Sequence, residues 1–368
     1  MSVQPFLEDF GPRFLYYQIR QIQDVPAADS HIVDVALLDM HHGWPNLGRD
    51  SLVRALGEIC LDLQPLLETA GMKMRVLSYD VRRSGVVPET PGRRFALYVG
   101  TGGPGHIDPH RNDGVSDGTQ GIREDPAWEA PAFRLFDAIA AHDEAALLGV
   151  CHSFGVLCRW SGAAHPVLRS AGKGGKSSGL VESILTEDAL CHPWFSRFSA
   201  KLPDQRRFSS LDSRLYDLIP SLHGLPHGRV PVSYEVNAST GMAGDALTMI
   251  EFARDRGGAM PRILALNHHP EIRDRNRQRR VLESMFARGE VARDWYEERS
   301  RTLDQAFSTP ESERDVALTS HFTLLAPLRF HLYRQVRQRA DKLGVDTALH
   351  EDSVLRDPSG LMDRNHNC

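Results

Sequence analysis

The chain has 368 residues, of which 41% are hydrophobic and 25% are charged, so it can bury a large core in one or two domains. Its net charge of −5 at pH 7 excludes a strongly basic surface for nucleic acid or for an anionic membrane. The five cysteines are scattered and odd in number, which indicates a reducing compartment rather than a disulfide framework.

No targeting segment is evident in the sequence. Residues Met1 to Pro5 lack the charged and apolar regions of a signal peptide, and no apolar run reaches about 18 residues, the length that a membrane-spanning helix needs. These observations predict a soluble, cytoplasmic protein with neither a membrane nor a nucleic acid as its partner.

Strands and helices are expected to alternate in the first half of the chain. Residues 1–30 are expected to form a helical arm whose aromatic side chains pack on the body or on a partner chain. Strands are expected at residues 31–39, 74–79, 95–99 and 146–150, with helices at 49–70 and 132–141. This alternation is typical of βαβ units, so we expect a mostly parallel sheet covered by helices on both faces.

The second half is less regular. Strand-like pieces are expected at residues 179–185, 230–236, 246–252 and 263–266. From residue 274 to about residue 343 the chain reads as helices rich in Arg and Glu, and its last residues form a polar tail. No internal repeat or low-complexity segment is present.

Cys151 stands at the junction of a strand and a helix. The apolar run Ala146–Val150 ends at this cysteine, and a helix-compatible stretch from Ser153 to Trp160 follows. A sharp strand-to-helix turn holds one side chain above the sheet with a helix N-terminus beneath it, which stabilises a thiolate. Cys151 is therefore the candidate nucleophile; the alternative is a buried core cysteine.

Two further segments supply possible partners for this thiol. The strand at 263–266 runs directly into Asn267-His268-His269-Pro270-Glu271, where His269 can accept a proton and Glu271 can orient its ring. His268 is the less suitable base, because the spacing to Glu271 favours His269. The glycine-rich loop Gly100–Gly105 follows an earlier strand, at the edge where open α/β sheets bind ligands, and its N–H groups can face an oxyanion.

Together these motifs resemble the class I glutamine amidotransferase superfamily over roughly residues 31–275. The resemblance implies a flavodoxin-like three-layer sandwich, preceded by the helical arm at 1–30 and followed by a helical extension with a polar tail at 276–368. It implies a Cys-His-Glu catalytic triad of Cys151, His269 and Glu271, with Gly103 and His152 as backbone donors of the oxyanion hole. It further implies substrate contacts from Gly102, Gly105 and Ser153, and no cofactor or metal.

The sequence departs from the family pattern after the nucleophile. Family members usually continue as Cys-x-Gly-x-Gln, whereas here Ser153 stands at the position of the Gly and Gly155 at that of the Gln. The loss of this Gln removes a contact to glutamine, so the identity of the amide substrate stays open. The segment 106–130 is longer and more polar than a minimal domain needs, which suggests a lid or a substrate wall.

Other features have simpler interpretations. A metal site formed by His41, His42, His106 and His110 lacks supporting Cys or acidic spacing. The stretch SAGKGGKS at 170–177 has Ser170 where a phosphate-binding loop has its first Gly, so a flexible loop is expected there. The Arg-rich run 273–280 is expected to be a solvated helix face.

Three functions remain open. In the first, Cys151 forms a thioester with glutamine or a related γ-glutamyl amide and releases ammonia. No synthetase domain is evident in this chain, so use of the ammonia would need a separate partner chain. The second is a stand-alone hydrolase or acyl/amide transferase acting on another substrate, and the third is a non-catalytic scaffold. In each case the terminal helices offer surfaces for a second copy of the chain.

Overall fold

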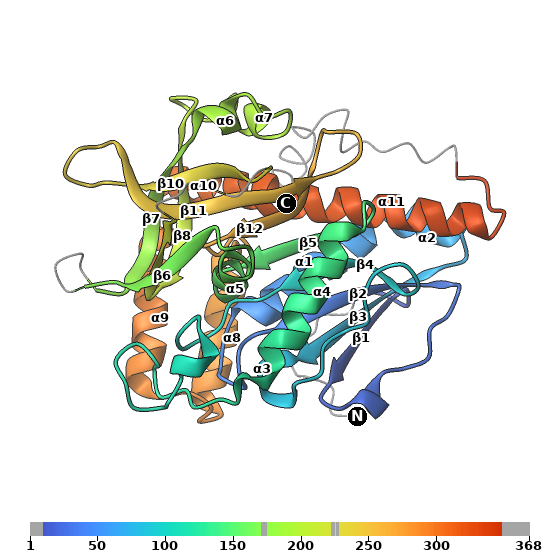
Figure 1. Cartoon of the computed structure of the whole chain (residues 1–368), viewed down its shortest axis with the longest axis horizontal. Coiled ribbons are helices and arrows are strands. Elements are labelled where there is room, and N and C mark those ends of the chain that lie inside the picture. Colours follow the sequence, from blue (N-terminus) through green and yellow to red (C-terminus); the bar gives the residue numbers. More distant parts are fainter. Residues whose placement is uncertain (1–9, 171–174, 222–224, 226–227, 348–368) are drawn as a thin grey trace.

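A computed structural model of the chain describes residues 10–170, 175–221, 225 and 228–347. Its centre is a row of six parallel strands in the order β1-β3-β2-β4-β5-β12 (Figure 1). These strands are β1 (Phe14–Ile19), β2 (Ile32–Asp39), β3 (Lys73–Asp80), β4 (Phe95–Gly100), β5 (Ala146–Val150) and β12 (Pro261–Leu266). The predicted parallel sheet is confirmed for this part of the fold.

Antiparallel strands extend the sheet beyond β12. In order they are β11 (Ala243–Arg254), β10 (Val230–Val236), β7 (Ser177–Leu185) and β8 (Arg207–Arg214). Off this path, β9 (Tyr216–Pro220) pairs with β11 and with β6 (Ala164–Leu168). Strands β6, β8 and β9 were not predicted. In β8, charged side chains are buried as a pair, Arg214 with Asp212 at 2.7 Å, so an apolar pattern does not mark this strand.

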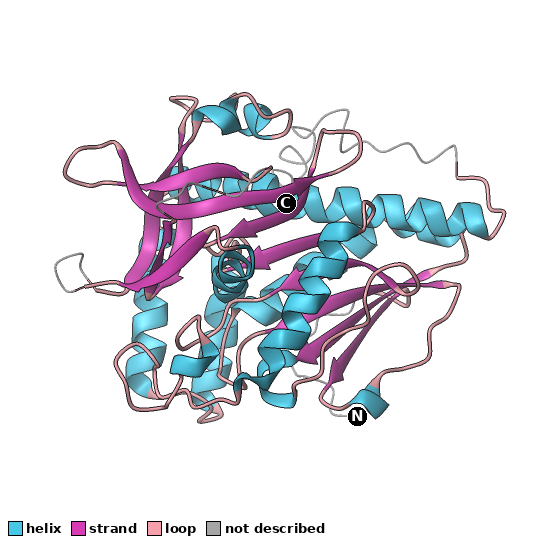
Figure 2. Cartoon of the chain, in the orientation of Figure 1, coloured by secondary structure: helices cyan, strands magenta, loops and turns pink. Residues whose placement is uncertain are grey.

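Helices cover both faces of the parallel strands (Figure 2). On one face, α4 (Glu129–Ala141) and α5 (His152–Ser161) pack side chains such as Phe136 and Phe154 against Tyr98 and Leu147. On the other, α1 (Gly48–Asp62), α2 (Gln64–Thr69) and α11 (Ala326–Lys342) pack against side chains that include Val35. These layers agree with the predicted flavodoxin-like sandwich.

The remaining helices lie around the sheet. They are α3 (Val81–Ser84), α6 (Glu187–Leu190), α7 (Phe195–Ser199), α8 (Arg275–Ala287), α9 (Arg293–Ala306) and α10 (Pro310–Ser320). A π-helical turn, η5 (His321–Leu325), joins α10 to α11. In the described ranges, no helix is both long enough and apolar enough to cross a membrane.

The expected N-terminal helical arm is wrong for the part of it that the structure describes. Residues 14–19 form the edge strand β1, paired in parallel with β3, and only one short 3-10 helix follows, η1 (Ile22–Asp24). The sequence of β1, FLYYQI, is rich in aromatic residues that favour strands when a neighbouring strand is available. Residues 1–9 of the expected arm lie outside the described residues.

The C-terminal segment is helical, as expected, up to the end of α11. Its last helix is part of the main fold, because Leu328, Leu332 and Val336 lie in the same apolar cluster as β2 and α1. Helices α8, α9 and α10 share a second cluster, which includes Leu282, Leu303 and the β8 residue Leu211. The expected polar tail lies outside the described residues.

A buried charge cluster ties three strands of the parallel sheet together, and its removal provides a test of the fold. Asp34, 1% exposed, pairs with Arg75 at 2.6 Å and with Arg94 at 3.0 Å. We expect Asp34→Ala to lower the free energy of unfolding by about 3–5 kcal/mol, because it leaves the buried Arg75 without its carboxylate and Arg94 with only the longer pair to Glu89, at 3.9 Å. Urea unfolding followed by circular dichroism measures this change.

The control is Glu311→Ala, which breaks an exposed pair with Arg314 and should change the free energy of unfolding by less than about 1 kcal/mol. An Asp34→Ala protein as stable as this control would show that the buried cluster contributes little.

Candidate functional site

The predicted site residues lie in three segments that directly follow three neighbouring strands, with His152 and Ser153 in the first turn of α5. In the register of the sheet, Gly100 of β4 pairs with Gly149 of β5, and Val150 of β5 pairs with Leu266 of β12. Their carboxyl ends therefore reach the same edge together. The segments that follow these ends contain the glycine loop, Cys151, and the His269–Glu271 pair, respectively.

Cys151 occupies the sharp turn that the sequence predicted. Its backbone has φ +51° and ψ −102°, which non-glycine residues rarely adopt, and α5 begins at the next residue. Its N–H continues the ladder by donating to the Leu266 carbonyl at 2.7 Å. The side chain is partly exposed, so the thiol is open to a ligand while its backbone is fixed by the sheet and the helix.

His269 connects Cys151 with Glu271. Its Nδ1–H donates to Glu271 Oε1 at 2.8 Å, which leaves Nε2 able to accept a proton, and the ring and the Cys151 side chain both lie close to Gly102. Burial opposes a charge on the ring, but the charges of Glu271 and Cys151 and the hydrogen bonds to both hold the pKa of His269 well above its ordinary value. Such an arrangement can deprotonate a thiol and later return the proton to a leaving group.

The glycine loop lies against this pair. A Cβ atom on Gly102 would be 3.1 Å from Cε1 of His269 and 3.3 Å from Cβ of Cys151, and one on Gly103 would overlap the Met40 carbonyl. Only glycine fits both positions without a shift. Among the described residues, no acceptor takes the backbone N–H of Gly103 or of His152, so both remain available to an oxyanion.

Arg82 links this glycine loop to the residue that follows β2. Its guanidinium donates to the carbonyls of Met40, at 2.8 Å, and Pro104, at 2.7 Å. The same buried group pairs with Glu124 at 2.6 Å. Because Arg82 spans two chain segments and is neutralised by a third, it fixes the position of the loop relative to the end of β2.

The segment 106–130 braces the loop and contributes to the pocket wall. It contains Glu124 and also Gln120, whose side-chain carbonyl accepts the N–H of Gly105 at 2.9 Å. Gln120 and Ile107 line the cavity next to Cys151. The segment therefore forms part of the cavity wall. From the sequence, either a lid or a substrate wall was expected for it.

Ser153 does not line the cavity with the other predicted residues. It is buried, and its hydroxyl donates to the Thr101 carbonyl at 2.7 Å, so it joins the turn to the loop after β4. Gly102 and Gly105, the other predicted substrate contacts, do line the cavity. The ring of His152 is buried, and burial lowers its pKa well below the ordinary value.

The cavity beside Cys151 has a volume of about 220 Å³ and includes residues that sequence reasoning missed. Lys176, at the start of β7, and Trp295, Glu298 and Arg299 of α9 line it together with His269. The sequence assigned Lys176 to a flexible loop and α9 to a separate extension. No local motif marks these residues, because they reach the cavity only through the packing of α9 beside β7.

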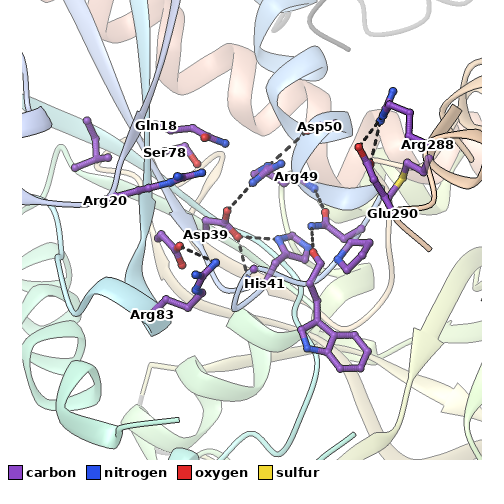
Figure 3. Close-up of a pocket in the computed structure, with 17 residues that line it drawn as sticks. Gln18, Arg20, Asp39, His41, Arg49, Asp50, Ser78, Arg83, Arg288 and Glu290 are labelled. Carbon is purple, nitrogen blue, oxygen red and sulfur yellow. Dashed lines mark hydrogen bonds and ion pairs between the residues drawn. The ribbon is translucent and has the colours of Figure 1, made fainter. Parts of the chain in front are cut away.

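His41 lies in the wall between this cavity and a second one of about 440 Å³ (Figure 3). Its Nδ1 is 2.8 Å from Asp39, which also pairs with Arg49 at 3.2 Å. Burial raises the pKa of Asp39, but the hydrogen bonds from His41 and the charge of Arg49 outweigh it and hold this pKa well below the usual range.

The second cavity lies at the ends of β1, β2 and β3. Its lining carries equal numbers of cations and carboxylates, which are Arg20, Arg49, Arg83 and Arg288 against Asp39, Asp50, Asp80 and Glu290 (Figure 3). Most of these groups neutralise one another, as Arg288 does with Glu290. The lining therefore does not select for a strongly charged ligand.

Three other sequence expectations concern a metal site, the SAGKGGKS stretch and the Arg-rich run. In the part of the chain that the structure describes, no group of three or more His, Cys, Asp or Glu side chains could hold a metal ion. In the SAGKGGKS stretch, residues 171–174 lie outside the described residues. The Arg-rich run 273–280 is only partly a solvated face, since Arg277 is buried and Arg273 pairs with Glu58 of α1.

No protein-family model and no curated protein matches the sequence. Solved structures do match, among them a glutamine amidotransferase from Thermotoga maritima (15% identity, TM-score 0.43, covering 83% of this chain and 98% of that one). Another from Methylobacillus flagellatus has 12% identity and a TM-score of 0.39, covering 84% and 92% of the two chains.

The glutaminase domain of a Trypanosoma brucei CTPS, solved with bound acivicin, also matches, with 10% identity and a TM-score of 0.32, covering 65% of this chain and 86% of that one. With TM-scores below 0.5 and identities of 15% or less, these likenesses assign no role to the residues of this chain.

We expect Cys151 to react faster than the other described cysteines with iodoacetamide near neutral pH. Cys158 is buried, and burial raises the pKa of the Cys60 thiol to about 12, whereas Cys151 is partly exposed and lines the same cavity as His269. Peptide mass spectrometry after timed labelling gives each rate. His269→Ala should slow Cys151 and leave exposed Cys191 unchanged; equal rates at Cys151 and Cys191 in the unmodified protein would contradict activation.

Glu271→Gln should lower the pKa of His269, since it removes the charge that contributes most to raising it. The ring of the unmodified protein should keep its proton to a higher pH than the ring of the variant. NMR titration of the imidazole signals measures both values. An unchanged titration would mean that Glu271 does not act on this ring.

Proposed function

We propose that this protein is a cysteine-dependent amidase of the glutamine amidotransferase type. In this proposal Cys151 is the nucleophile, His269 is the general acid and base, and Glu271 orients the imidazole. Gly103 and His152 stabilise the oxyanion through their backbone N–H groups. The observation that carries the proposal is that the ring of His269, hydrogen-bonded to Glu271, and the side chain of Cys151 lie together at the edge of the sheet and line one cavity.

The proposed reaction has two halves. First, the Cys151 sulfur attacks the amide carbonyl and its proton passes to His269; the C–N bond then breaks as His269 gives that proton to the departing nitrogen, which leaves as ammonia. Second, water attacks the thioester while His269 accepts its proton, and the C–S bond breaks to give a carboxylate and the free thiol. The glycine loop stabilises the negative oxygen in both halves.

Because the three residues have different roles, their loss should lower turnover to different degrees. Glu271 touches only the imidazole, so its loss should affect turnover less than the loss of His269, which carries the proton itself. Loss of either residue should lower turnover less than loss of Cys151, because no other described nucleophile stands at this turn. This proposal also needs no bound metal or cofactor for the bonds it breaks.

An alternative substrate is favoured by one observation. The family places Gln at position 155, but here Gly155 is buried, and a Cβ atom on it would be only 2.8 Å from the side chain of Ile107. Gly155 therefore contributes no side chain to the cavity, and Ile107 lines it beside this position. A stand-alone hydrolase or acyl transferase acting on an amide other than glutamine is therefore the second candidate.

The fate of the ammonia belongs to the same proposal. If the amide nitrogen is transferred, we expect a separate synthetase chain to receive it. In the absence of that chain, hydrolysis should still proceed and give ammonia and a carboxylate in equal amounts.

The test is release of ammonia from glutamine and from a panel of γ-glutamyl and other amides. The protein should release ammonia from at least one of them, and Cys151→Ala should reduce the rate to background while keeping the fold, because it removes only a partly exposed thiol. Coupled glutamate dehydrogenase assay measures the ammonia.

His269→Ala should lose at least about 100-fold in kcat, and Glu271→Gln should lose less. Release of ammonia by the Cys151→Ala protein at an undiminished rate would assign the chemistry to another residue. No release from any amide, alone or with synthetase chains added, would refute the proposed activity.

A further inference from the structure

An acyl substrate of Cys151 needs contacts beyond its reacting carbonyl, and position 155 supplies none. The cavity wall opposite the glycine loop comes instead from the helical C-terminal segment and from β7 and β8. Lys176, Arg214 and Arg299 bring three cationic side chains to this wall. Their partners differ, and that difference identifies the one available to a ligand.

Two of the three cations are already neutralised. Lys176 pairs with Glu298 at 2.6 Å. Arg214 lies among three carboxylates, pairing with Asp212 at 2.7 Å and with Asp217 at 3.1 Å, and also with Glu235. Neither group therefore offers a full positive charge to a molecule in the cavity.

Arg299 is different. Its guanidinium donates to the hydroxyl of Ser213 and lies over the ring of Trp295, 5.5 Å from the ring centre. Among the described residues, no carboxylate forms an ion pair with it. Arg299 and Cys151 line the same cavity, and although the charges of Glu298 and Cys151 raise the pKa of Arg299, burial lowers it more.

The position of Arg299 is fixed by its helix. Thr302, one turn further along α9, is 2.8 Å from the hydroxyl of Ser178 on β7, and Asp304 pairs with Arg275 of α8. The cation–π contact with Trp295 and the hydrogen bond to Ser213 limit the movement of the guanidinium. A planar, oriented guanidinium with free N–H groups is suited to a carboxylate, which it can bind with two parallel hydrogen bonds.

We propose that Arg299 is the specificity-determining residue of this site and binds a carboxylate on the acyl part of the substrate. The inference rests on the proposed function for the reaction at Cys151, and it adds that the cavity selects amides with a carboxylate on their acyl part. Helix α9 of the C-terminal segment thus performs the substrate selection for which the family uses the Gln after its nucleophile. Neutral amides of the same length are poor substrates.

Two alkylating agents of nearly equal size test this inference without any substrate. Iodoacetate carries a carboxylate and iodoacetamide does not; in both reactions the Cys151 sulfur displaces iodide from the CH₂ group. We expect Arg299→Gln to slow the reaction with iodoacetate by about tenfold, and to change the reaction with iodoacetamide by less than about twofold. Arg299→Lys should retain part of the preference, because it keeps the charge but not the fork.

The matched control is Arg301→Gln, on the same helix but exposed and outside the cavity, which should change neither rate. Circular dichroism of all variants shows whether they are folded. Equal effects of Arg299→Gln on both reagents, or no effect on either, in a folded protein would overturn the inference.

The test of Arg299 can fail while the proposed amidase activity holds, and the reverse is also possible. Where an amide substrate is found, Arg299→Gln should raise KM for carboxylate-bearing amides far more than it lowers kcat. If the protein releases ammonia and Arg299→Gln still reacts with iodoacetate as the unmodified protein does, only the proposed role of Arg299 is refuted. A clear preference at Cys151 with no amidase activity would refute only the proposed function.

Discussion

The parallel pairing of β4, β5 and β12 is the constraint on which the site depends. Because these strands are adjacent and in register, the segments that follow them begin at the same edge of the sheet. The N–H of Cys151 is bound to the end of β12, so the turn that exposes the thiol is an extension of the ladder. The unusual backbone of Cys151 is maintained by a strand on one side and a helix on the other.

Buried charges then hold the loops that the sheet alone does not fix. Arg82 joins the glycine loop to the end of β2 and is balanced by Glu124, while Asp39 holds His41 in the wall between the two cavities. Each of these groups would be costly to bury alone, so each pair specifies one arrangement of its loop. Segment 106–130 thereby becomes part of the site's support.

The C-terminal helices complete the site from outside the parallel sheet. Helix α9 packs on β7 and brings Trp295 and Arg299 to the cavity, while Leu211 of β8 accepts the N–H of His269. The antiparallel half of the sheet thus supports His269 and part of the cavity wall beside Cys151.

The sequence alone determined the parallel core and the positions of Cys151, His269 and Glu271, because strand-end residues in an α/β fold can be located from local hydrophobic pattern and spacing. It did not reveal β1, whose strand character depends on pairing with β3, nor β8, whose buried charges conceal it. Only the tertiary structure decided that Ser153 is buried and that Arg299 reaches the cavity. The physical reason is that both depend on contacts between residues distant in sequence, which no local pattern encodes.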